Sequence, residues 1–110
     1  MKQYVLDQIQ PQDFEMIKGQ LETRFGAPRL DNVFRIVLPP ERLTGLQKTH
    51  ADCGPFYFAA ELENDRLNCE LLVRSGSTLR CDCIGYATVD QRNWLIAEID
   101  DLLRDSGVSL

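Results

Sequence analysis

The fold of this 110-residue chain is decided by residues 55–86, which read PFYFAAELENDRLNCELLVRSGSTLRCDCIGY. Apolar and polar residues alternate through this stretch, and turn-forming residues interrupt it at 64–65 and at 75–77. Period-two alternation is typical of half-buried strands, and connections this short join antiparallel neighbours. We therefore predict a three-strand meander over 55–63, 66–74 and 78–86.

The two short turns also predict the register of the meander. Ala60 is expected to face Cys69, Phe58 to face Leu71, and Cys69 to face Cys83. One face of the sheet is then apolar or Cys at every position: 56, 58, 60, 62, 67, 69, 71, 73, 79, 81 and 83. Because a slip of one residue would turn this whole set outward, the pattern specifies the register strongly. Three of the four cysteines are predicted to point into the core.

Helices and further strands complete the predicted domain. Apolar residues at helical spacing predict a helix over 12–25, which follows Pro11. A second helix, 88–105, begins with Thr88 and Gln91 in the spacing of a capping box. Residues 33–38 and 2–9 are predicted as one or two further strands. We expect one α+β domain over 1–110: an antiparallel sheet, made of the three-strand C-terminal meander plus these strands, with helices 12–25 and 88–105 packed on one face.

Composition narrows the classes of partner and compartment. The chain has 12 Lys+Arg against 17 Asp+Glu, a formal net charge of −5 and no basic stripe, so we expect no nucleic-acid binding. No apolar run approaches the roughly 18 residues of a membrane span, and the first residues lack a signal-peptide core, so no membrane partner is expected. We expect a cytoplasmic protein with reduced thiols. Nucleotide-binding and hydrolase motifs are missing, so no cofactor is expected.

A possible metal site is formed by His50, Cys53, Cys81 and Cys83. His50 is the single histidine of the chain, and one imidazole with three thiolates is a known zinc ligand set. On a regular strand, however, residues two apart have Cα atoms about 7 Å apart. Two such thiolates cannot easily reach one ion, whose bound sulfurs lie about 3.8 Å apart. Buried structural thiols are therefore the favoured interpretation, and a metal site is the alternative.

Catalysis by the loop that carries His50 and Cys53 is not expected. The two residues lie three positions apart on one loop, and no oxyanion loop accompanies them. The chain is therefore predicted not to be an enzyme.

An acidic patch is predicted on the other face of the sheet. Glu61, Glu70 and Asp82 are expected to lie together there, with Glu70 opposite Asp82. Like charges that face each other destabilise a sheet unless a cation or a basic partner lies between them. A solvated sheet face is the favoured interpretation, and a cation or partner site is the alternative.

Five side chains are candidates for a protein interface. Tyr57, Leu72, Ile84 and Tyr86 are predicted on the exposed sheet face, and Trp94 on the acidic side of the closing helix. Tryptophan is enriched at binding hot spots, which favours an interface. Cover of Trp94 by the 49–55 loop or by the N-terminal strand is the alternative.

The sequence thus favours a small, cytoplasmic, non-enzymatic domain that binds a protein partner or pairs with itself as a homodimer. The order of elements loosely resembles that of longin and roadblock domains, without a shared motif, and this resemblance implies a dimerising scaffold. The alternative is a thiol- or zinc-dependent protein that uses the His50–Cys53 loop with Cys81 and Cys83.

Overall fold

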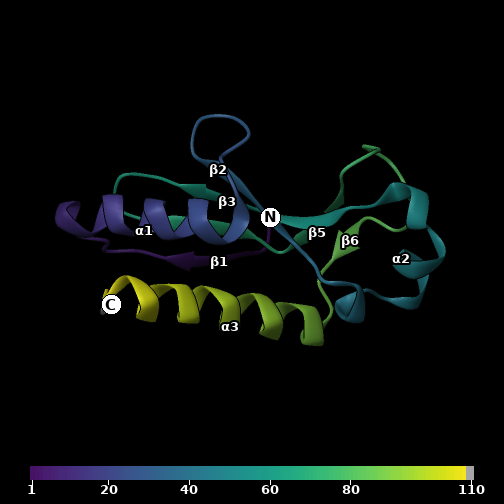
Figure 1. Cartoon of the computed structure of the whole chain (residues 1–110). Helices are drawn as coiled ribbons and strands as arrows, with labels where there is room; N and C mark the ends of the chain where they lie inside the picture. Colours follow the sequence, from purple (N-terminus) through teal and green to yellow (C-terminus); the bar gives the residue numbers. More distant parts are fainter. Residues whose placement is uncertain (109–110) are drawn as a thin grey trace.

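An antiparallel sheet runs the length of the molecule (Figure 1). The computed structural model describes residues 1–108, and within them the sheet has six strands. They are β1 (Gln3–Leu6), β2 (Val33–Val37), β3 (Phe56–Leu62), β4 (Leu67–Glu70), β5 (Leu72–Ser75) and β6 (Gly85–Tyr86). Their order is β1-β4-β3-β5-β6, and β2 pairs with the other edge of β3. The predicted α+β class with an antiparallel sheet is confirmed.

Two long helices cover one face of this sheet. α1 (Pro11–Phe25) and α3 (Val89–Ser106) run side by side in Figure 1 and contact each other. Pro11 occupies the first turn of α1, where a missing N–H costs nothing. The predicted capping box at the start of α3 is present, because Thr88 accepts from the Gln91 N–H and the Gln91 side chain accepts from the Thr88 N–H.

The core lies between the helices and the sheet. It combines aromatic and aliphatic side chains of the strands with the inner stripes of α1 and α3: Phe34, Ile36, Phe56, Phe58, Leu62, Leu67, Val73, Ile17, Leu21, Leu95, Ile99 and Leu102. In β3 the buried side chains alternate with less buried ones, as the period of two predicts. The opposite face of the sheet carries no helix in the described part of the chain.

The register of the meander holds for one half and changes in the other. Ala60 faces Cys69 as predicted, but Tyr57 faces Arg74, whereas an uninterrupted ladder would put it opposite Leu72. The shift occurs at Leu71, whose N–H donates to the Lys2 carbonyl at 3.0 Å. The predicted pairing of Phe58 with Leu71 is therefore wrong. Because the register shifts by two residues, the side chains of β5 that were predicted to face the core still lie on the core side of the sheet.

The predicted third strand of the meander is reduced to β6. Residues 78–84 are irregular apart from a turn at Asp82 and Cys83, and Leu79 is 94% exposed rather than in the core. The Ser75 hydroxyl accepts from the backbone N–H groups of Ser77 and Thr78, which closes a turn in place of a continued ladder. Cys69 and Cys83 are both buried but do not pair across the sheet, so that part of the prediction was wrong.

Short helical turns connect β2 to β3. They are η1 (Pro40–Arg42), α2 (Gly45–Thr49) and η2 (Ala51–Cys53), and α2 lies at the end of the molecule opposite the C-terminus (Figure 1). Through residue 108, none of the helices combines the length and the apolar composition that a bilayer crossing requires.

Candidate metal centre

The structure brings His50, Cys53, Cys81 and Cys83 together at the end of the molecule that carries α2. Their possible ligand atoms all lie within 4.8 Å of one another. His50 Nδ1 is 3.0 Å from Cys81 Sγ, and Cys53 Sγ is 3.8 Å from Cys81 Sγ. Residues 31 positions apart in the sequence therefore share one small cluster.

Two tight turns supply the four side chains. His50 follows the last residue of α2 and donates its backbone N–H to Leu46, and Cys53 donates its own N–H to the His50 carbonyl at 2.9 Å. In the second turn, the Cys83 N–H lies 3.5 Å from Cys81 Sγ, and the Ile84 N–H donates to the Cys81 carbonyl at 3.0 Å. Each turn thus directs two donors into the same space.

A buried pair of glutamines holds the second turn in place. The side-chain amide of Gln47 donates to the Cys83 carbonyl at 3.4 Å, and that of Gln91 donates to Gln47 Oε1 at 2.9 Å. Both glutamines are also the third helical residue of a capping box, in α2 and α3 respectively. Gln47 was not among the predicted site residues, although Thr44 and Gln47 have the same spacing as the capping box that opens α3.

Hydroxyl groups hold the first turn. Ser75 donates its hydroxyl to the Cys53 carbonyl, and Ser77 donates its hydroxyl to the Asp52 carbonyl at 2.8 Å. The end of β5 is therefore tied directly to the segment that carries Cys53.

The three thiols of the cluster differ in acidity. Hydrogen bonds from the side chain and backbone of Cys83, with further ones from His50 and Cys53, lower the pKa of Cys81 to about 7. Burial raises the pKa of Cys83 to about 12, and it also raises the pKa of Cys53. Cys81 is therefore the thiol that ionises first, and a bound cation would favour the thiolate form of the other two.

The donor set fits a four-coordinate zinc ion in number, type and size. The 3.8 Å between Cys53 Sγ and Cys81 Sγ equals the spacing of about 3.8 Å that two sulfurs have on one tetrahedral zinc. Thiolate and imidazole are the ligands that zinc takes in structural sites. Cys81 and Cys83 lie in a turn and not on the predicted regular strand, so the wide strand spacing that opposed a zinc ion does not apply to them.

The predicted acidic residues are only partly together. Glu61 and Glu70 line the same shallow hollow on the open sheet face, and Glu70 accepts a 3.0 Å bond from Arg74 Nε. Asp82 lies in the turn between Cys81 and Cys83 and not on a strand opposite Glu70. The structure therefore does not bring the three carboxylates into the register that was expected.

The five interface candidates are spread over different surroundings. Trp94 and Ile84 are half-buried and pack against the core. Tyr57 is half-buried beneath the Arg35 guanidinium, 4.3 Å from the ring centre, and Leu72 is also half-buried. Tyr86 is the most open of the five, at 48% exposure.

Comparison with known proteins identifies no relative. No protein-family model, no curated protein and no solved structure matches the chain. The function is therefore inferred from the geometry of the site.

Proposed function

We propose that the protein binds one zinc ion through His50, Cys53, Cys81 and Cys83, and that this ion is structural. The observation that carries the proposal is the convergence of four zinc-type donors from two separate turns within 4.8 Å. Four protein ligands complete a tetrahedral shell, which leaves no open position for a substrate or an activated water. The ion would cross-link the α2–η2 segment to the turn between β5 and β6.

Metal analysis of the protein purified under reducing conditions tests this proposal. We expect about one zinc per chain, since a closed four-ligand site binds a single ion. Cys53→Ser and Cys81→Ser should each lose the metal, whereas Cys69→Ser should keep it. Cys69 is a matched control because it is a free cysteine that is buried in β4, outside the cluster.

Cobalt provides a second readout. Titration of the metal-free protein with Co²⁺ should give the near-ultraviolet charge-transfer band of cobalt–thiolate bonds, and the band should be absent in Cys81→Ser. A protein that purifies without metal and shows no such band when titrated contradicts the proposal. An equal zinc content in wild type and in Cys81→Ser does so as well.

We infer self-association as a second candidate function, favoured by the edge of β2. Within residues 1–108, β3 is the only strand that pairs with β2; the other edge of β2 is bridged by Leu30 at Val33 and has free backbone groups beyond it, toward Val37. Val37 at this edge is 47% exposed. Exposed strand edges of this kind pair readily with a second chain. Sedimentation of wild type and Val37→Asp tests it: a concentration-dependent dimer that the variant abolishes supports self-association, and a wild-type monomer at all concentrations opposes it.

Both proposals suit a cytoplasmic protein. A centre of three thiols requires a compartment that keeps cysteines reduced, as the cytoplasm does.

A further inference from the structure

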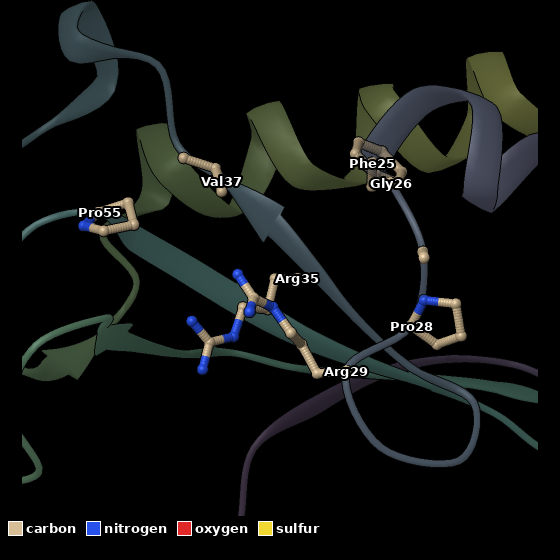
Figure 2. A pocket seen from close by; sticks show the side chains of 8 residues that line it. Phe25, Gly26, Pro28, Arg29, Arg35, Val37 and Pro55 are labelled. Carbon is tan, nitrogen blue, oxygen red and sulfur yellow. The ribbon is translucent and has the colours of Figure 1, made fainter.

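A second hollow lies outside the metal cluster, between the end of α1 and β2. It has a volume of about 560 Å³, within the size range of small-molecule sites. Its wall includes two arginines, Arg29 and Arg35, beside apolar side chains that include Phe25, Pro28, Val37 and Pro55. Figure 2 shows both arginine side chains extending across this hollow, Arg29 from the loop after α1 and Arg35 from β2.

Among the carboxylates that the structure describes, none pairs with either of the two arginines. Through residue 108, neither Arg29 nor Arg35 forms an ion pair, although five other arginines do: Arg24, Arg42, Arg66, Arg74 and Arg104. The chain carries five more acidic than basic residues, so carboxylates are plentiful. Two cations that share one hollow repel each other unless an anion lies between them. This arrangement is what a site for an external anion requires.

Local structure positions the backbone of Arg29 and the guanidinium group of Arg35. The Arg29 N–H donates to the Val33 carbonyl at 2.9 Å, and Leu30 forms a β-bridge with Val33, so the loop folds back onto β2. The Arg35 guanidinium lies 4.3 Å from the centre of the Tyr57 ring. Cation–π contact of this kind leaves the edge of the guanidinium and its N–H donors available to a ligand.

We propose that this hollow binds the oxyanion of a small organic acid, a carboxylate or a phosphate monoester, between Arg29 and Arg35. The planar forks of two arginines match the paired oxygens of carboxylate and phosphate. The apolar part of the ligand would lie against Phe25, Pro28 and Val37, which form the rest of the wall. The site is independent of the proposed zinc ion, because none of the four metal-ligand candidates lines it.

Isothermal titration calorimetry with phenyl phosphate and with benzoate tests this site. We expect at least one of the two to bind with a stoichiometry of one per chain, and benzyl alcohol, which lacks the charge, not to bind. The probe that binds more tightly identifies the oxyanion class. Arg29→Gln and Arg35→Gln should each weaken binding by about tenfold or more, as expected for loss of a charge-assisted contact. Arg92→Gln is the matched control, because Arg92 is an exposed arginine on α3 that does not line the hollow.

Two results would overturn the proposal. One is that neither oxyanion gives a saturable isotherm at millimolar concentration; the other is that Arg29→Gln and Arg35→Gln bind as wild type does. Circular dichroism establishes that each variant is folded, and neither probe titration depends on the zinc content, so failure here is distinguishable from failure of the zinc proposal. If Arg35→Gln does not fold, Arg35→Lys replaces it: the charge and the ring contact remain, the fork is lost, and weaker binding is expected.

Discussion

Addition of one methyl group at Gly76 should destabilise the domain where the two turns of the metal cluster are joined. A Cβ at this position would lie 2.7 Å from Pro55 Cδ and 3.0 Å from Pro55 Cγ. The optimal van der Waals separation of two nonbonded carbons is about 3.5–4.0 Å, so the backbone of the turn would have to move by about 1 Å. The Gly76 N–H already donates to the Pro55 carbonyl at 2.8 Å, and that bond would be strained as well. We expect Gly76→Ala to cost about 1–3 kcal/mol, the usual range for overpacking.

Urea unfolding of Gly76→Ala and of a glycine control measures this effect. The control is Gly19→Ala in α1, where an added Cβ meets nothing within 4 Å. In a helix interior, Ala is better than Gly by about 1 kcal/mol, so the control should be stabilised. Zinc affinity should fall in Gly76→Ala alone, because the moving turn includes Ser75, which bonds the Cys53 carbonyl. A loss of stability in Gly76→Ala below about 0.5 kcal/mol, the range of neutral surface changes, would refute this account of the packing.

Two further predictions concern buried polar and thiol groups. Cys69→Ser should cost about 1–3 kcal/mol in urea unfolding, because a hydroxyl replaces a fully buried thiol; an unchanged midpoint would oppose this. Burial raises the pKa of Cys69 from 9.0 to about 12. The protonated thiol therefore contributes fully to the free energy of unfolding below about pH 9, and this contribution is lost as the pH rises toward 12. Cys69→Ser should remove the corresponding part of the dependence of the free energy of unfolding on pH. Gln91→Ala should cost about 1–3 kcal/mol and slow zinc uptake by stopped-flow, because it removes the buried amide that donates to the Arg42 carbonyl and to Gln47 Oε1. Arg92→Ala, at the exposed neighbouring position, should leave the stability and the uptake rate unchanged.

Local signals explain which parts of the fold were predictable from sequence. The helices follow from apolar spacing and from caps such as Thr88 with Gln91, which depend only on near neighbours. The pairing of Ala60 with Cys69 follows from the two-residue turn beside it. Residues 78–84 alternate equally well in sequence, yet the Ser75 hydroxyl bonds the next backbone N–H groups and ends the ladder. Alternation does not reveal that competition, because it depends on one hydroxyl group's hydrogen bonds.

The candidate metal centre was only partly predictable for the same reason. Ligand chemistry alone is enough to single out His50, Cys53, Cys81 and Cys83. The four ligand atoms converge because residues 81–83 form a turn; on a regular strand, Cys81 and Cys83 would be too far apart to share one ion. The Gln47 contact to Cys83 joins residues 36 positions apart and has no signal in the spacing of the cysteines.

The distribution of buried side chains gives a physical reason for a metal at this end of the molecule. Residues 39–54 bury only Gln47, and residues 76–90 bury only Cys83. The sole buried residues of these two described segments thus bond each other, and apolar side chains of the segments such as Leu43 and Ile84 are only half-buried against the main core. Segments that cannot bury enough apolar surface need a covalent or metal cross-link to remain ordered. Because zinc binding contributes directly to folding free energy, an ion at the four-residue cluster would add to the sparse apolar packing at this end of the domain.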